Sequence, residues 1–443
     1  MRLFGLLLIL IAFLVPAFGF ADLAQRHDAA AIFSQYLGAC ALIAMAIAQL
    51  LATRLAGLEA VFGGMDRIYV LHKWLAIVAV VCVLLHDTID ADIDGIGRET
   101  WLTETAETLG EISLYSLLVL ATVSVATFVP YHLWKITHKV MGTVFAAGAL
   151  HFIFILKPFA NGDALALYIL AFCSAGVLAY IYTLLPIAAY KGWRGYTVTA
   201  VEPTGDAVAV TLTPTGRGLR HRAGQFAFVT FDLPDLGEVH PFTISKAPDN
   251  AGVVRFTIKA LGDYTQAVSR ALAQGVQARV SRPFGHFHLD RSPGDQIWIA
   301  SGVGITPFAA WAPAVGDIDG NVHLFYCVRS RALAPHLREL ETLAARHPNF
   351  HLHVIESQTA GRLRPEDIAV HIPTGREAVG VAFCGPKDMR EAFRHGLARL
   401  GFAPRRLRYE EFEIRSGLGL RKLAAWLIAR FGAGEPARRR RPA

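Results

Sequence analysis

Six apolar stretches near the start of the chain constrain its fold more than any other feature. They cover residues 3–20, 32–51, 68–89, 112–129, 140–159 and 164–187. Each approaches the roughly 20 residues that a helix needs to cross a hydrocarbon core of about 30 Å. We therefore predict an all-α six-helix membrane bundle over residues 1–190. The first stretch also fits a secretory signal peptide, but five more stretches follow it and no clear small-residue cleavage site closes it.

Loop charges predict how the bundle is oriented. The basic loop residues are Arg54, Arg67, Lys135, Lys191 and Arg194. The loop after the third stretch carries only Arg98 against the acidic residues Asp87, Asp90, Asp92, Asp94, Glu99, Glu104 and Glu107. Because Lys and Arg are enriched in cytoplasmic loops, we expect a multi-pass protein of the plasma (inner) membrane. Both termini would be cytoplasmic and the acidic loop would lie outside.

Two soluble domains and a tail are predicted after residue 190. The short strands TVTAV, AVAVTLT, QFAFVTF and VRFTIKA, broken by Gly, Pro and Asp, indicate an antiparallel β-barrel over residues 191–293. From residue 294 to 415 the strands QIWIA, HLFYCV, HLHVI and VGVAFC alternate with helical segments, which is typical of a parallel α/β domain. The chain is thus predicted to be a multidomain membrane protein with a tail over residues 416–443.

Cysteine spacing and charge exclude some classes of function. The five cysteines are scattered without metal-ligand spacing, which excludes an iron–sulfur cluster evident from sequence and a disulfide framework. The net charge of +7 comes partly from the run 438–441, which favours contact with anionic lipid over nucleic acid. The tail has an apolar side formed by Leu420, Leu423, Leu427 and Phe431. It is predicted to lie on the membrane surface or, equally well, to cap the soluble domains.

Four histidines belong to two of the membrane spans. His72 and His86 lie near the inner and outer ends of the third span, and His138 and His151 take the corresponding places in the fifth. Ionisable side chains inside a membrane are costly and indicate a function, and imidazole is a standard axial ligand of haem iron. Separations of 14 and 13 residues correspond to about 21 and 20 Å of helix rise, which accommodates two haems at two depths.

Pairing of these histidines follows from the predicted topology. Both spans run from inside to outside, so His72 would face His138 and His86 would face His151, each pair binding one b-type haem. In a regular helix His138 and His151 would lie about 140° apart, so either the fifth span is distorted or its ligands approach the haems from different sides. Histidines that only hydrogen-bond between helices are the alternative.

Two motifs predict a flavin site on the barrel. The candidates in HPFTIS are His240, Pro241, Phe242, Thr243 and Ser245, and those in KALGDYT are Lys259, Gly262, Asp263 and Thr265. The first motif offers a hydrogen-bond partner, an aromatic contact and a donor for the pyrophosphate of FAD. The second leads into a helix whose free N–H groups can receive phosphate. Phe412 is predicted either to cover the flavin ring or to pack in a terminal strand.

A nicotinamide nucleotide site is predicted where GVGITP follows a strand. The candidates in this motif are Gly302, Gly304, Ile305, Thr306 and Pro307. Glycines let the backbone approach a pyrophosphate, Thr306 is expected to cap the next helix, and Pro307 suits its first turn.

Two later segments add to this predicted site. Arg329 and Arg331 would bind a 2′-phosphate and favour NADPH over NADH, although solvated surface arginines would look the same. The turn Cys384, Gly385 and Pro386 is suited to flank nicotinamide. Cys384 has no adjacent base, which argues against covalent catalysis.

Taken together, these residues resemble the ferric reductase and NADPH oxidase superfamily, in which a six-helix haem domain is fused to a ferredoxin–NADP reductase-like module. The resemblance covers about residues 32–415 and depends on HPFT, GVGITP, CGP and the histidine pairs. It implies that the four histidines bind two stacked haems. His240 and Phe242 stand where the reductase module usually has Arg and Tyr, as in the oxidase branch, so FAD is expected to be held loosely.

The resemblance also implies an activity. We expect an NAD(P)H-dependent flavocytochrome that passes electrons from cytoplasmic NADPH or NADH, through FAD and two haems b, to an extracytoplasmic ferric or cupric ion or to oxygen. No nucleophile or general base is required, so no catalytic residue is assigned. Superoxide or peroxide production, donation to a periplasmic redox protein and a redox sensor without sustained turnover remain alternatives. The expected partners are membrane lipid and the acceptor, not nucleic acid.

Overall fold

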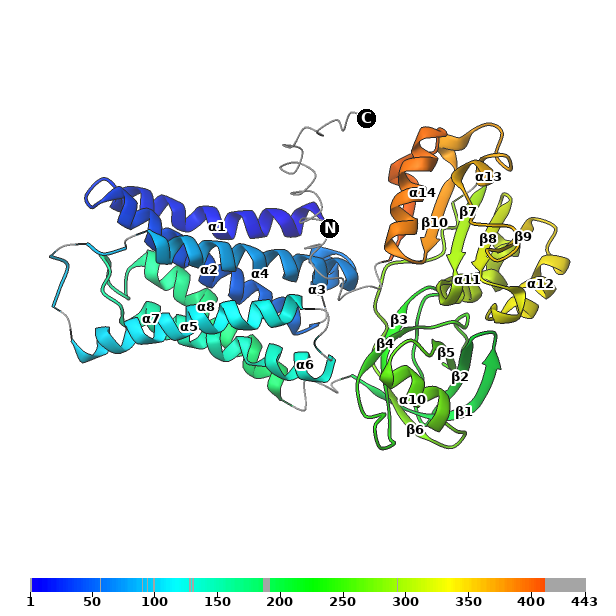
Figure 1. Ribbon diagram of the computed structural model, residues 1–443, viewed down its shortest axis with the longest axis horizontal. Coiled ribbons are helices and arrows are strands. Elements are labelled where there is room, and N and C mark those ends of the chain that lie inside the picture. The colour runs from blue at the N-terminus through cyan, green and yellow to red at the C-terminus, as the bar shows by residue number, and fades with distance from the viewer. Residues whose placement is uncertain are drawn as a thin grey trace, which may run out of the picture. The chain divides into compact units, whose positions relative to one another are not determined.

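The computed structural model describes residues 2–410 apart from residues 56, 90, 94, 99, 127, 128, 130, 186–191 and 293. The side chains of Tyr131 and His132 also lie outside the described part. The chain forms two compact units, one of helices and one of sheets (Figure 1). The helical unit contains residues up to 62 and residues 68–185, and the described part of the second unit contains residues 63–67 and 192–410.

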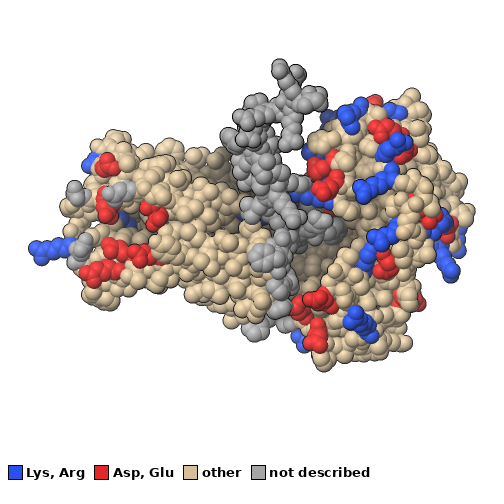
Figure 2. All heavy atoms as spheres, in the orientation of Figure 1, with Lys and Arg blue, Asp and Glu red and all other residues tan. Residues whose placement is uncertain are grey.

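Long apolar helices make up the first unit. Their bounds are α1 (Leu3–Leu23), α2 (Ala29–Ala52), α3 (Leu58–Phe62), α4 (Met65–Thr88), α5 (Trp101–Val125), α6 (Tyr131–Lys139), α7 (Met141–Phe154) and α8 (Ala164–Leu184). Within the described residues, six spans are long and apolar enough to cross a membrane, and α6 with α7 supply the fifth. Figure 2 shows few charged side chains on the flank of this unit that is in view. The predicted six-span bundle is therefore confirmed.

The fourth span starts earlier than predicted. α5 begins at Trp101 rather than at residue 112. Thr100 and Thr103 cap it reciprocally, with Thr100 N donating to Thr103 Oγ1 at 2.7 Å and Thr103 N donating to Thr100 Oγ1 at 3.4 Å. Glu104 lies in the first turn, where a negative charge suits the helix dipole. Glu104 and Glu107 therefore belong to a helix and not to the predicted acidic loop.

Two pairs of helices pack closely within the helical unit. α2 packs along α8, and α5 packs along α7. Small residues allow this close packing: a Cβ added at Gly176 of α8 would lie 2.9 Å from Ala46 Cα of α2. α4 is joined to α2 by ring hydrogen bonds: His72 Nδ1 donates to Ala48 O at 2.9 Å, and His86 Nδ1 donates to Ser34 O at 2.9 Å.

The second unit begins with an antiparallel barrel. Its elements are β1 (Arg194–Thr204), β2 (Ala207–Pro214), β3 (Phe226–Phe231), β4 (His240–Thr243), β5 (Val254–Lys259), α10 (Asp263–Ala271) and β6 (Gln277–Val280). The strand order is β4-β3-β6-β1-β2-β5, and a bridge between Ile244 and Phe256 joins the two end strands and closes the barrel. Alternate residues such as Tyr196, Val198 and Val210 point into its core.

A parallel sheet completes the second unit. Its strands are β7 (Gln296–Ser301), β8 (Val322–Val328), β9 (Phe350–Glu356), β10 (Gly380–Cys384) and β11 (Leu407–Tyr409), in the order β11-β10-β7-β8-β9. Its helices are α11 (Thr306–Trp311), α12 (Leu337–Arg346), α13 (Pro365–Ala369) and α14 (Lys387–Arg399). One core lies under α11 and α12 and a second under α13 and α14. The predicted fold class is confirmed for both domains, and the carboxyl ends of all five strands meet at one edge.

Candidate functional site

The four predicted haem ligands lie on α4, α6 and α7, and all are held in the same way. The Nδ1 atom donates from His72 to Ala48 O at 2.9 Å, from His86 to Ser34 O at 2.9 Å, from His151 to Ala106 O at 2.8 Å and from His138 to Ser124 Oγ at 3.1 Å. Each Nε2 then carries a lone pair, and no hydrogen-bond partner for it occurs among the described residues. Metal-binding histidines typically have this arrangement.

His72 and His138 face each other. Their imidazole centroids are 6.1 Å apart, with the ring planes at 62°. A metal ion bonded to two opposite imidazole nitrogens at about 2 Å each would separate the centroids by roughly 6 Å. Trp134 stacks on His138 at 4.9 Å and restricts its ring. The observed separation therefore fits a pair of axial haem ligands.

His86 and His151 form the second pair, and their imidazole rings are close enough to interact electrostatically. Two glycines give their rings room. A Cβ added at Gly38 would lie 3.2 Å from His86 Nε2, and one added at Gly110 would lie 2.7 Å from His151 Nδ1. The Ser34 hydroxyl bonds to the carbonyl oxygen of His86 at 2.9 Å. Sequence analysis missed Gly38, Gly110 and Ser34, because only helix packing brings them to the histidines.

The fifth span is broken at Val140, between α6 and α7. Val140 N donates to Thr137 O at 3.1 Å, a three-residue turn that overwinds the backbone between His138 and His151. Of the two predicted ways to reconcile the 13-residue spacing, the structure has the distorted span. α6 and α7 together extend from Tyr131 to Phe154, whereas the predicted span covered residues 140–159.

The two predicted flavin motifs meet on the barrel. The ring of His240, in β4, stacks on Tyr264 of α10 with the centroids 3.8 Å apart, and Phe242 stands 6.4 Å from His240. His240 Nε2 lies 3.2 Å from Glu238 Oε2. Burial raises the pKa of Tyr264, and the negative Glu238 raises it further, so the phenol remains a hydrogen-bond donor. Neither Tyr264 nor Glu238 was predicted.

The start of α10 is open to a ligand. Thr265 Oγ1 accepts hydrogen bonds from the amides of Leu261 at 2.9 Å and Gly262 at 3.0 Å. A Cβ added at Gly262 would meet nothing within 4 Å. Asp263 occupies the first turn and would compete with phosphate there. The amides of Leu261 and Gly262 are thus already engaged, and the FAD contacts of these residues remain predictions.

The other predicted flavin residues are already engaged. Pro241 pairs with Phe228 in the sheet, and Thr243 is buried. Ser245 is fully buried, and its hydroxyl is 2.8 Å from that of Thr257. Lys259 forms an ion pair with Asp206 at 2.5 Å, so its charge is partly neutralised. Phe412 lies outside the described residues.

The two predicted nucleotide motifs also meet. Gly302, with φ +54°, begins the 3-10 turn η1 (Gly302–Ile305) directly after β7. A Cβ added at Gly304 would lie 2.3 Å from the carbonyl oxygen of Cys384, and one added at Gly385 would lie 2.9 Å from Ser301 Cβ. Glycine is therefore required at both places for the turns to approach each other. Pro386 follows as the N-cap residue of α14.

Thr306 was predicted to cap α11, and this prediction is wrong. The N-cap is Ile305, which makes no side-chain cap bond, and Thr306 is the first helical residue. Because η1 runs directly into α11, the preceding turn occupies the place of a capping residue. Ile305, Thr306 and Pro307 are all buried, and Pro307 lies in the first turn as predicted.

Arg329 and Arg331 follow β8 at the same edge of the sheet. Arg331 forms an ion pair with Glu341 of α12, and its amide donates to Glu356 Oε2 at 2.9 Å. Arg329 is exposed, and no ion pair of its guanidinium occurs among the described residues. Arg329 is thus the freer of the two to meet a 2′-phosphate.

Glu410 follows β11 at this edge and was not predicted. It is 5% exposed, and a Cβ added at Gly285 would lie 2.5 Å from its Oε1. Burial raises the pKa of the Cys384 thiol, and the nearby Glu410 raises it further. Cys384 therefore remains a neutral thiol. The pairing of β11 with β10, which sequence alone did not reveal, brings Glu410 to the site.

Three family models match the chain. The model described as "Ferric reductase like transmembrane component" matches residues 37–149, an FAD-binding domain matches residues 190–298, and an oxidoreductase NAD-binding domain matches residues 298–395. The chain has the ferric reductase/NADPH oxidase-like architecture. This ferric reductase-like chain is a multi-pass membrane protein and an NAD(P)H-dependent oxidoreductase.

Curated relatives match about half of the ferric reductase-like chain. The reductase component of a naphthalene 1,2-dioxygenase/salicylate 5-hydroxylase system from a Ralstonia species is 27% identical over 49% of this chain and 68% of its own length. The flavohemoprotein of Bordetella pertussis is 26% identical over 50% of this chain, which spans 61% of that protein. Among solved structures, the Amycolatopsis cytochrome P450 reductase GcoB has a TM-score of 0.43 and 25% identity over 50% of this chain and 70% of its own.

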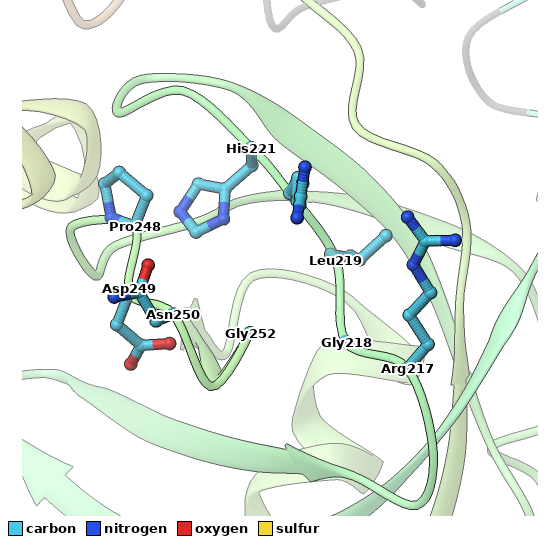
Figure 3. Close-up of a pocket in the computed structure, with 9 residues that line it drawn as sticks. Arg217, Gly218, Leu219, His221, Pro248, Asp249, Asn250 and Gly252 are labelled. Atoms are coloured by element: carbon cyan, nitrogen blue, oxygen red, sulfur yellow. The ribbon is translucent and has the colours of Figure 1, made fainter.

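A separate hollow of about 480 Å³ lies in the barrel of this ferric reductase-like chain, between residues 217–221 and 248–252 (Figure 3). Arg217, Arg220 and Asp249 line it together with His221, which is 8% exposed. His221 Nε2 bonds to the carbonyl oxygen of Lys246 at 3.1 Å. The predicted FAD and NAD(P) residues in the described ranges do not line this hollow, so it is distinct from both predicted sites.

Proposed function

We propose that this enzyme carries electrons across the membrane, from cytoplasmic NAD(P)H to an acceptor on the other side, using FAD and two b-type haems. FAD exchanges a hydride for single electrons, and haem carries one electron at a time. The basic residues Arg54, Arg67 and Lys135, opposite the acidic segment around Asp92, support cytoplasmic termini and location in the plasma (inner) membrane.

The uniform arrangement of the four histidines carries this proposal. A histidine that only links helices would have no reason to leave Nε2 unbonded, because an unpaired polar atom inside a membrane is costly. All four instead use Nδ1 and leave Nε2. His72 and His138 would hold one haem, and His86 and His151 the other.

In the second unit, the residues bind and position the nucleotides. His240 and Tyr264 would support the flavin, and Gly302 and Gly304 would let the backbone approach the NAD(P)H pyrophosphate. The Cys384 turn would flank the nicotinamide. An unpaired Arg329 favours NADPH over NADH, because a guanidinium can bind a 2′-phosphate with two hydrogen bonds.

Exposed acidic side chains favour a ferric or cupric ion as the acceptor. Glu104, Glu107 and Glu111 are exposed on α5, and Ala106 in the same turns accepts the hydrogen bond of His151. Carboxylates so close to an outer haem ligand would raise the local concentration of cations. Oxygen, with superoxide or peroxide as the product, and a periplasmic redox protein are the outcomes to be distinguished by assay.

Visible spectroscopy of the full chain, purified in detergent with FAD, tests the proposal. Addition of NADPH should bleach the flavin and then shift the haem Soret band, with steady turnover when an Fe(III) chelate is supplied. A single reduction without turnover would indicate a sensor. A signal from a superoxide trap instead of Fe(II) would indicate an oxidase.

Histidine variants test the ligand assignment. His86→Leu should lose part of the haem and its electron delivery to the acceptor, while NADPH still reduces FAD. His27→Leu, in the loop between α1 and α2, is the matched control and should keep both haems. Full haem content and full transmembrane activity in His86→Leu would contradict the assignment of the outer pair.

A further inference from the structure

A cluster of histidines lies on the parallel sheet, away from both predicted cofactor sites. His323 is on β8, His351 and His353 are on β9, and His371 follows α13. His323 pairs with His351 in the strand register, and Phe325 pairs with His353. Paired residues of neighbouring strands point to the same face, so these rings lie together on the face covered by α13 and α14.

Three of these rings converge. His323 Nδ1 lies 3.1 Å from His353 Nε2, and the ring of His371 lies 4.3 Å from that of His353 and 5.4 Å from that of His323. One ring nitrogen from each of His323, His353 and His371 lies within 4.8 Å of the others. Two nitrogens of a tetrahedral zinc site are roughly 3.4 Å apart, given bonds of about 2.0–2.1 Å. Contraction of the nitrogen–nitrogen distances by at most about 1.4 Å would therefore bring all three onto one ion.

All three side chains of the cluster are imidazoles. Burial, and then the neighbouring histidines, lower the pKa of His323 and that of His353 to about 4. A set of imidazoles without thiolate suits Zn²⁺, Cu²⁺ and Ni²⁺ rather than Ca²⁺ or Mg²⁺.

The backbone around the cluster is fixed. Hydrogen bonding between β8 and β9 holds His323 and His353 in register. Arg376 holds the segment that bears His371, donating to Ile372 O at 2.6 Å and to Ala369 O at 2.9 Å. His351 bonds to Asn321 Oδ1 through Nε2 at 3.2 Å and stacks on His323 at 4.7 Å, so it supports the ring of His323.

We propose that His323, His353 and His371 form a binding site for a divalent transition-metal ion of the Zn²⁺ class, with a fourth position left for water. The site joins β8, β9 and the segment after α13. His323 lies near the amino end of β8 and His353 at the middle of β9, whereas Gly302, Arg329 and Cys384 lie at or just after the carboxyl ends of the strands. A bound ion would therefore stabilise the second unit and take no part in hydride transfer.

Calorimetric titration of the full chain, loaded with haem and FAD and freed of loose metal by a chelator, tests this site with ZnCl₂. Wild type should bind one Zn²⁺ that His353→Ala and His371→Ala bind at least about tenfold more weakly. His395→Ala, which removes an exposed histidine of α14 outside the cluster, is the matched control and should bind like wild type. Co²⁺ in place of Zn²⁺ should give the visible absorption of a tetrahedral site in wild type only.

NADPH reduction of FAD serves as the folding control, because the cluster lies on the face of the sheet under α13 and α14, whereas the predicted nucleotide motifs lie at the carboxyl ends of β7, β8 and β10. It should be unchanged in every variant. Should His353→Ala prove unstable, His371→Ala still decides the question, since His371 lies outside the strands. Equal Zn²⁺ affinity in wild type and His371→Ala, or no Zn²⁺ binding by wild type, would overturn the proposal. In that case the histidines only hydrogen-bond and stack with one another.

Discussion

Gly304→Ala is the substitution that most directly tests the predicted nucleotide site. The added Cβ would lie 2.3 Å from the carbonyl oxygen of Cys384, 2.8 Å from its carbonyl carbon and 3.3 Å from its Sγ. Ordinary contact distances are about 3.5 Å, so the turn after β7 and the turn after β10 must separate by roughly 1 Å. Overpacking of this kind typically destabilises a fold by about 1–3 kcal/mol.

The effect on NADPH should be larger than the effect on stability. A misplacement of about 1 Å at a reacting centre can cost about 100-fold, so kcat/KM for NADPH-driven flavin reduction should fall between about 10- and 100-fold. Stopped-flow bleaching of FAD in the full chain measures this. Gly216→Ala is the matched control, because a Cβ there meets nothing within 4 Å. Wild-type kinetics and unfolding in Gly304→Ala would refute the close approach of the two motifs.

Three further predictions follow from single contacts. Arg329→Ala should raise KM for NADPH by about tenfold with little change in KM for NADH, since a charged hydrogen bond contributes about 1.5–3 kcal/mol. Arg331→Ala removes an arginine already paired with Glu341 and should change the ratio of the two KM values less. Equal effects of Arg329→Ala on both nucleotides would contradict this prediction. Ser34→Ala should weaken haem binding by about 10- to 100-fold at His86, measured as haem content in detergent, and full retention would show that Ser34 is not needed. Burial, and then the charge of Arg222, lowers the pKa of His288 to about 4 from 6.5, so the folded state binds fewer protons and loses stability as pH falls from 6.5 to about 4. His288→Gln should remove that loss, at most about 3 kcal/mol, and lower the acid midpoint of unfolding followed by circular dichroism; an unchanged midpoint would rule this out.

The predicted start of the fourth span was wrong because hydropathy identifies apolar residues, whereas a helix can continue through polar ones. α5 extends back to Trp101 through Glu104 and Glu107, which are polar yet helical because Thr100 caps the segment. Likewise, no pattern in the sequence marks the break at Val140. The 13-residue spacing of His138 and His151 predicted either a distorted span or ligands that approach the haems from different sides.

The arrangement of the site depended on contacts between distant segments. Tyr264 belongs to the motif KALGDYT, but only the position of α10 in the fold brings its ring against His240. Glu410 gained its position near Cys384 only from the pairing of β11 with β10. The three histidines of the proposed zinc site come from two strands and the segment after a helix, at spacings that form no motif.

By itself, the sequence determined the membrane spans, the order of barrel and parallel sheet, and the motifs that mark the nucleotide sites. These features are local: hydropathy accumulates along a span, side-chain alternation follows from strand geometry, and a glycine turn acts within a few residues. The tertiary structure alone decided which atoms meet, as in the free Nε2 atoms of the four histidines and the contact of Gly304 with Cys384. Those meetings depend on packing between segments far apart in the chain, which no local pattern encodes.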